Sequence, residues 1–215
     1  NFKFNFDLFE FKGLIKTGLP IAVISYIYAV YIGLDKIFIL NYFGSDALGN
    51  YLPALQVTTA LSVLPASIFQ IIYPKLAYRY GKTNDINSLK NLVFRPQLIL
   101  AFSLIPIIII AIFCIDPFVN YVLPDYVDGI LAAKWMIVVI YLRCLGGPQD
   151  ILMITEDLSP YLICTLICAF IFWLLVYILK DVYNDFHIVP LSLAISTFIF
   201  NFIISCYVYL KMKNS

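Results

Sequence analysis

The sequence predicts an all-α, polytopic membrane protein built as a bundle of six transmembrane helices. Its composition is the first indication, because 62% of the residues are hydrophobic and only 13% are charged. A soluble domain of 215 residues could not bury that much apolar surface in one core. The second indication is the arrangement of the apolar residues, which lie in long stretches. About 20 residues in a helix are enough to cross a bilayer.

Six stretches meet this length between clusters of charged and turn residues. They cover residues 19–43, 47–73, 97–115, 129–154, 158–179 and 188–210. Runs such as 107–112 are continuously apolar and do not alternate with polar residues, which favours helices over strands. The connections between the stretches are short, so we expect no separate soluble domain.

We divide the chain into an interfacial linker, residues 1–16, and a six-helix transmembrane lobe, residues 17–213. The first eleven residues are rich in phenylalanine, with polar residues between the rings. Such a segment is expected to lie along the membrane surface, where Lys3 and Lys12 can reach the headgroups. The sequence starts at Asn1 without the pattern of a signal peptide, and we expect a preceding part of a longer protein.

Basic residues are unevenly distributed among the loops, and this distribution predicts the orientation. If the helices alternate in direction, ten of them fall on one side: Lys3, Lys12, Lys16, Lys75, Arg79, Lys82, Lys90, Arg95, Lys211 and Lys213. The opposite loops hold only Lys180. One loop on the basic side is atypical, because Asp150, Glu156 and Asp157 lie there without a cation, but acidic residues weigh little in this rule. We therefore expect a protein of the cytoplasmic membrane with both ends in the cytoplasm.

The sequence has no pattern typical of an enzyme, a metal site or a cofactor site. Cys164 and Cys168 share a helix face, but neither His nor carboxylate accompanies them at metal-binding spacing. His187 is the only histidine and lies in a loop. Catalytic triads, phosphate-binding glycine loops and paired carboxylates are also missing from the sequence. We expect no enzymatic activity, cofactor, metal or nucleic-acid partner.

Ionisable residues inside the apolar stretches are the best candidates for function, because a charge in mid-membrane costs about 3 kcal/mol or more. Counting residues along the helices places Asp35 and Lys134 at a similar depth. These two side chains form either a buried ion pair or a contact with a substrate or ion. Arg143 precedes a helix break at Gly146, where its guanidinium could bind a phosphate or a freed carbonyl. Lys36 faces away from Asp35 and is expected to extend outward.

Neutral polar residues inside the stretches add to this set. Gln56 and Asn201 could line a hydrophilic cavity or join two helices by hydrogen bonds. Five residues therefore form the candidate substrate-binding set: Lys134, Arg143, Asp35, Gln56 and Asn201.

The order of several short motifs resembles the C-terminal lobe of the polysaccharide flippases, which export O-antigen and capsule units. These flippases belong to the multidrug/oligosaccharidyl-lipid/polysaccharide flippase superfamily. The motifs are Gly18-Leu19-Pro20, Gly33-Leu34-Asp35-Lys36, the segment 43–51, Tyr73-Pro74-Lys75-Leu76 and Leu123-Pro124-Asp125-Tyr126. The resemblance extends over essentially the whole chain, and the order of the motifs is more specific than any one of them.

This resemblance implies a two-lobe transporter around a central cavity, in which this chain is the second lobe and the N-terminal lobe of the same protein is its partner. The implied cargo is an oligosaccharide repeat unit on a polyprenyl pyrophosphate, moved across the bilayer for O-antigen, capsule or lipopolysaccharide synthesis. Cations on the cavity wall would offset the pyrophosphate charge, and Lys134 and Arg143 are the candidates. Relatives often have a basic turn where this sequence has Thr155-Glu156-Asp157.

Two other classes of function remain open at this stage. A drug or metabolite antiporter of the same superfamily would use Asp35 as a ligand for the coupling ion. A membrane scaffold without transport activity would keep Asp35, Lys134 and Arg143 as structural pairs.

Overall fold

The computed structural model describes residues 8–183 and 185–214, and these residues form helices joined by short turns. The α-helices are α1 (Leu8–Asn50), α2 (Leu52–Leu61), α3 (Val63–Thr83), α4 (Lys90–Val122), α5 (Ile130–Cys144), α6 (Gly147–Ile154), α7 (Leu158–Tyr183) and α8 (Ile188–Asn214). Two 3₁₀-helices, η1 (Ile86–Leu89) and η2 (Pro124–Gly129), connect α3 to α4 and α4 to α5. The described residues contain no β-strand. The predicted all-α fold is confirmed.

Five helical segments are long and apolar enough to cross a membrane, and a bent pair of helices makes a sixth. The five are Gly18–Asn50, Leu52–Thr83, Ile86–Val122, Leu158–Tyr183 and Ile188–Lys213. The sixth consists of Pro124–Cys144 and Gly147–Ile154, which meet at an angle of 45°. The six segments correspond in order to the six predicted stretches. The chain is therefore an all-α, polytopic membrane protein.

Helix α1 is interrupted at Gly44, where the chain reverses toward α2. Gly44 has a φ of 86°, a conformation that side chains with a Cβ rarely adopt. The break falls in the loop that the sequence predicts after residue 43. The second predicted span is likewise divided, because α2 and α3 are separated at Ser62.

Helix α1 already begins at Leu8, so residues 8–16 of the predicted linker are helical. Residues 1–7 lie outside the described part of the chain. The division into a linker and a lobe therefore stays a prediction.

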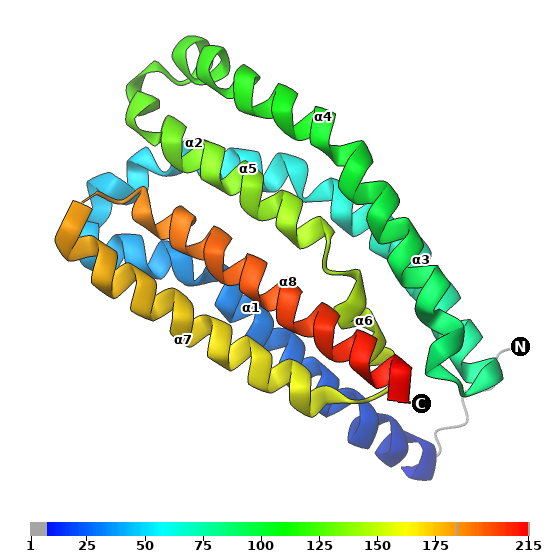
Figure 1. The fold of residues 1–215 in the computed structure, drawn as a ribbon. Coiled ribbons are helices and arrows are strands. Elements are labelled where there is room, and N and C mark those ends of the chain that lie inside the picture. Colours follow the sequence, from blue (N-terminus) through cyan, green and yellow to red (C-terminus); the bar gives the residue numbers. More distant parts are fainter. Residues whose placement is uncertain (1–7, 184, 215) are drawn as a thin grey trace, which may run out of the picture.

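Helix α8 lies at the centre of the bundle. It packs against α5 and α7 along most of its length, and α6 also contacts it (Figure 1). Helix α5 is covered in turn by α2 and α4, while α1 lies against α7 and α8. Large buried side chains fill the space between these helices, among them Tyr161, Phe172 and Phe200.

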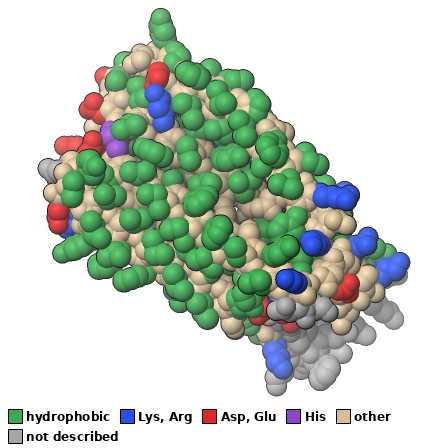
Figure 2. Space-filling model, viewed as in Figure 1, with side chains coloured by type: hydrophobic (Ala, Val, Ile, Leu, Met, Phe, Trp, Pro, Cys, Tyr) green, Lys and Arg blue, Asp and Glu red, His purple; other side chains and the backbone are tan. Residues whose placement is uncertain are grey.

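The outer surface is largely apolar. Phe102 and Phe113 on α4 are 71% and 74% exposed, which only a nonpolar environment or a second protein surface would favour. Figure 2 shows green hydrophobic side chains over the middle of the molecule, with blue Lys and Arg gathered at one end and most of the red Asp and Glu at the other. The start of α1 and the end of α8 both lie at the blue end (Figures 1 and 2). This segregation of charge is the one that the orientation prediction requires.

Reporter fusions to the full-length protein test the orientation. Green fluorescent protein joined after Ser215 should fluoresce, because it folds in the cytoplasm, whereas alkaline phosphatase joined after Asp181 should be active on the outer side. The control exchanges the two reporters, and both should then be inactive. Active phosphatase after Ser215 would reverse the predicted orientation.

A second prediction concerns Gly129, where the backbone that leads into α5 meets the α1–α2 junction. A Cβ at this position would collide with the carbonyl oxygen of Asn50 and lie 3.0 Å from Pro53. Gly129→Ala should therefore lower the apparent melting temperature of the detergent-solubilised protein, with a loss of about 1–3 kcal/mol. Gly81→Ala is the matched control, because a Cβ at Gly81 meets nothing within 4 Å. Equal melting temperatures of Gly129→Ala and wild type would contradict the close approach of Gly129 to Asn50 and Pro53.

Candidate functional site

The break between α5 and α6 is held by two side-chain amides from other helices. A helix end leaves its last carbonyl groups without intrahelical N–H donors, and inside a membrane these groups need partners from elsewhere. The Nδ2 of Asn201 on α8 donates to the carbonyl of Leu142 at 2.5 Å. The Nε2 of Gln97 on α4 donates to the carbonyl of Leu145 at 2.6 Å. Asn201, predicted to line a cavity or join helices, joins α8 to α5.

Arg143 lies on the last turn of α5, at this break. Its Nη2 is buried and has no hydrogen-bond partner among the described residues. The guanidinium is close enough to act electrostatically on Tyr28 of α1 and on Tyr51 at the start of α2. Arg143 is therefore a partly buried cation with an unpaired donor, a state that favours binding of an anion.

Two acceptors on α6 are also buried without a partner. The Oε1 of Gln149 and the Oδ2 of Asp150 make no hydrogen bond within the described part of the chain. Both residues lie in the first turn of α6, directly after Pro148. Buried polar atoms are nearly always hydrogen bonded in native proteins, so three unpaired atoms around one helix break mark this region for a ligand.

A cavity of about 320 Å³ adjoins the break. Helix α6 contributes Gln149 and Asp150 to its wall, and three tyrosines from α1, α3 and α7 contribute aromatic rings: Tyr28, Tyr73 and Tyr161. The rings of Tyr28 and Tyr161 lie 5.8 Å apart, and each also packs against Phe200 on α8. The cavity therefore combines rigid apolar faces with unpaired polar groups.

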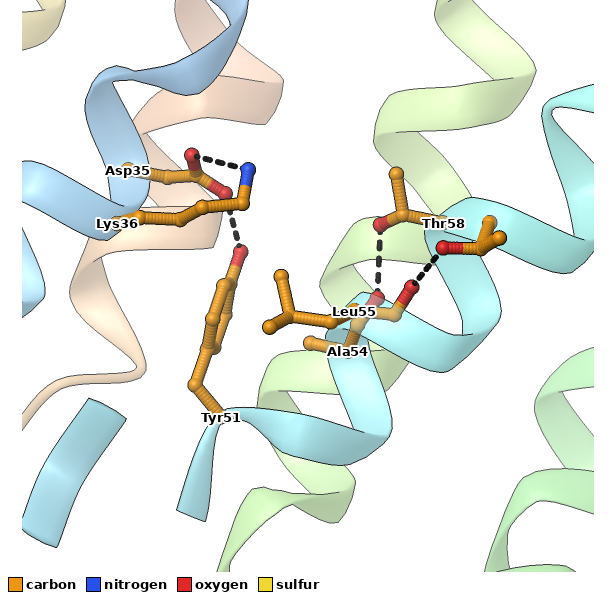
Figure 3. A network of polar contacts seen from close by, with 7 residues as sticks. Asp35, Lys36, Tyr51, Ala54, Leu55 and Thr58 are labelled. Atoms are coloured by element: carbon orange, nitrogen blue, oxygen red, sulfur yellow. Dashed lines mark hydrogen bonds and ion pairs between the residues drawn. The ribbon is translucent and has the colours of Figure 1, made fainter. Parts of the chain in front are cut away.

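Asp35 belongs to a separate network, shown in Figure 3. Its side chain is buried, and its Oδ2 accepts a hydrogen bond of 2.8 Å from the hydroxyl of Tyr51, which is also buried. The Nζ of Lys36 lies 3.4 Å from the other carboxylate oxygen, so Lys36 folds back toward Asp35. Beyond Tyr51, the hydroxyl of Thr58 donates to the carbonyl of Ala54, one turn earlier on α2. The Asp35–Tyr51 bond ties α1 to the start of α2 across the Gly44 break.

The suggested ion pair between Asp35 and Lys134 is wrong. Lys134 on α5 pairs with Asp116 on α4, at an N–O distance of 2.7 Å. The predicted third span ends at residue 115, whereas α4 continues through Pro117 to Val122. Asp116 is therefore a helix residue facing α5. Both partners are partly exposed, at 31% for Lys134 and 45% for Asp116.

The five candidate residues thus do not form one cluster. Arg143 and Asn201 meet at the α5–α6 break, Asp35 lies in the α1–α2 network, and Lys134 is paired with Asp116. Gln56 is exposed on α2. Their role in binding stays a prediction.

Sequence reasoning missed Gln149, Asp150 and the three tyrosines of the cavity. Asp150 was assigned to a loop, although it lies three residues beyond Gly147 in a helix that begins with Gly-Pro. That dipeptide could have been used to predict the start of α6, because proline favours the first turn of a helix. The expectation that Asp157 lacks a cation is wrong, because Lys211 of α8 binds its carboxylate at 2.7 Å.

A second, larger cleft of about 640 Å³ lies at the basic end, between α3 and α4. Lys75, Arg79 and Lys82 line it from one face of α3, at the i, i+4 and i+7 positions. This cleft would attract anions toward that end of the bundle.

Comparison with known proteins gives one match. A family model described as "Polysaccharide biosynthesis protein" matches residues 1–129, more than half of the 215 residues. The matched part runs from the N-terminus to η2 and stops before α5. No curated protein and no solved structure matches the chain.

The Asp35–Tyr51 bond can be tested by removing the hydroxyl. Tyr51→Phe leaves one oxygen of a buried carboxylate without its donor, and we expect a loss of about 1.5–3 kcal/mol of stability. The measurement is the midpoint of unfolding by sodium dodecyl sulfate. Tyr121→Phe, at a residue 89% exposed, is the matched control and should leave the midpoint unchanged. An unchanged midpoint for Tyr51→Phe would contradict a structural role for this bond.

Proposed function

Because the chain belongs to the polysaccharide biosynthesis protein family, we propose that it is one lobe of a flippase for lipid-linked glycans. Its cargo would be an oligosaccharide repeat unit on a polyprenyl pyrophosphate. The protein moves this cargo from the cytoplasmic to the outer leaflet of the cell membrane, where the units become O-antigen or capsule. Membership supports the resemblance noted in the sequence and a role in polysaccharide synthesis at a membrane.

The buried, unpaired Nη2 of Arg143 is the observation that supports this function best. A pyrophosphate crossing the membrane loses much of its hydration, and a cation with unpaired N–H groups can replace it. Arginine suits this task because its planar fork of donors matches two phosphate oxygens at once. The unpaired Nη2 means that no existing ion pair has to be broken before the anion binds.

The other candidates have more limited parts in this proposal. Lys134 is bound to Asp116 and would reach the cargo only after leaving that carboxylate. Asp35 and Asn201 hold the helices that frame the site. Gln56 is exposed on α2 and would face the cavity between the two lobes.

The chain acts here as a transporter and not as an enzyme. Its partners would be the bilayer, the lipid-linked oligosaccharide and the N-terminal lobe of the same protein. The exposed apolar side chains on the long helices support contact with lipid and with that lobe. The basic cleft of α3 would lie on the cytoplasmic side, where the anionic cargo enters.

An ion-coupled antiporter of the same superfamily is the second candidate. Asp150 favours it more than the sequence suggested, because its carboxylate adds a second buried acid to Asp35. The two functions differ in cargo, and they are separated by measuring glycan export and drug resistance in the same strain.

Substitution of Arg143 tests the flippase. In cells that carry the full-length protein as their only copy, Arg143→Gln should lower surface polysaccharide about ten- to hundredfold, as expected for the loss of a charged hydrogen bond. Lipid-linked repeat units should accumulate in the inner leaflet, and Arg143→Lys should restore part of the export. Arg95→Gln, at an exposed residue of α4, is the matched control.

Protein amounts are compared by immunoblot. Normal export by Arg143→Gln at a normal protein level would refute the role of Arg143. Unchanged polysaccharide after deletion of the whole gene would refute the flippase.

A further inference from the structure

We propose that the tyrosine-lined cavity beside α6 is a subsite for a sugar residue, the one nearest the pyrophosphate. This inference rests on the proposed function and adds a position for the glycan. It assigns Gln149, Asp150 and Tyr73 as the residues that contact the sugar.

Two unpaired acceptors on one helix would accept hydrogen bonds from the hydroxyl groups of a sugar. The Oε1 of Gln149 and the Oδ2 of Asp150 are buried, and the two consecutive residues that carry them both line this cavity. A buried acceptor without a donor costs free energy, and a ligand that supplies the donor recovers it. A sugar carries neighbouring hydroxyl groups, which can donate to two adjacent acceptors at once.

The aromatic side chains of the cavity wall would pack against the apolar faces of a sugar ring. A sugar ring also has faces made of C–H groups, and these pack against flat aromatic side chains. Tyr161 is buried and held in place by Tyr28 and Phe200, with ring centroids 5.8 Å away in both cases. Tyr73 on α3 is 40% exposed and contributes the remaining ring of the cavity wall. Small-molecule sites commonly combine such apolar walls with a few polar groups that fix orientation.

Size and location define which part of the cargo fits. The cavity volume of about 320 Å³ is at the low end of the range for small-molecule sites, so it accepts one or two sugar rings and not a whole repeat unit. Arg143 lies in the last turn of α5, directly before the break, and Gln149 and Asp150 of the cavity wall lie in the first turn of α6, directly after it. A pyrophosphate bound to Arg143 would therefore place its first sugar at this cavity.

A metal ion fits the same groups less well. Hard cations need several oxygen ligands, usually more than one carboxylate. Within the described residues, Asp150 has no cluster of three or more His, Cys, Asp or Glu side chains around it. The chemistry of the cavity favours a neutral ligand rich in hydroxyl groups.

Binding to two lipids tests the subsite in the full-length protein reconstituted in nanodiscs. One probe is the lipid-linked repeat unit extracted from cells that lack the gene, and the other is polyprenyl pyrophosphate without sugars. Wild type should bind the sugar-bearing lipid about tenfold more tightly. Gln149→Leu and Tyr73→Leu should each remove most of this difference and leave binding of the bare lipid unchanged. Arg143→Gln should weaken binding of both probes.

Controls separate loss of the subsite from loss of folding. Tyr73→Phe keeps the ring and should bind like wild type, and Tyr26→Leu alters an exposed tyrosine of α1 outside the cavity wall. Each variant is first compared with wild type in thermal unfolding, and binding is scored for those that unfold like wild type. Asp150→Asn keeps an acceptor oxygen, so it should retain more sugar binding than Asp150→Leu.

Three outcomes would overturn the proposal. Equal binding of the two lipids by wild type would refute the sugar subsite while the Arg143 effect still supported the flippase. A sugar preference that survives both Gln149→Leu and Tyr73→Leu would move the subsite elsewhere. Failure of wild type to bind either lipid would refute the flippase and, with it, the subsite.

Discussion

The satisfaction of backbone carbonyls at one helix break determines how the centre of this bundle is built. Where α5 ends, regular helical hydrogen bonding stops: the carbonyl of Leu142 accepts a bond from the N–H of Leu145, only three residues on, and carbonyls left unpaired inside a membrane cost several kcal/mol each. Asn201 from α8 supplies a second donor to Leu142, and Gln97 from α4 supplies one to Leu145. Because these amides come from opposite neighbours, they also fix α5 between two helices. The two amides thus stabilise the break and join it to α4 and α8.

Local chemistry was sufficient to predict the fold class, the six spans and the main breaks. Hydropathy identifies a span from its own residues, and Gly44 and Gly146 interrupt helices for reasons contained in their own sequence. Helix ends were less predictable. The Asp116-Pro117 pair looked like the end of a span, yet α4 continues for six more residues to Val122. Proline can remain inside a membrane helix when neighbours satisfy the freed carbonyl, so its presence did not mark the boundary.

That single boundary error produced the wrong partner for Lys134. With Asp116 placed in a loop, Asp35 was the remaining acid at a suitable depth.

The cavity was unpredictable for a related reason. Its tyrosines come from α1, α3 and α7, and no spacing in the sequence links them. Asp150 joins them only because α6 bends by 45° from α5, and bend angles depend on packing between helices. Sequence periodicity predicts which face of one helix is buried, but it does not predict how two packed helices align along their lengths.

The contrast between the two cations of α5 follows from the same geometry. Lys134 has a carboxylate at 2.7 Å, so an incoming anion would have to displace Asp116 and leave that carboxylate without its cation. Arg143 lies at the break with a nitrogen that has no hydrogen-bond partner among the described residues. Binding costs less when a group need not exchange partners. In the proposed flippase, a pyrophosphate would therefore bind at Arg143 in preference to Lys134. Because the buried acceptors of α6 lie on the next helical turns, recognition of charge and recognition of sugar would depend on one break in one helix.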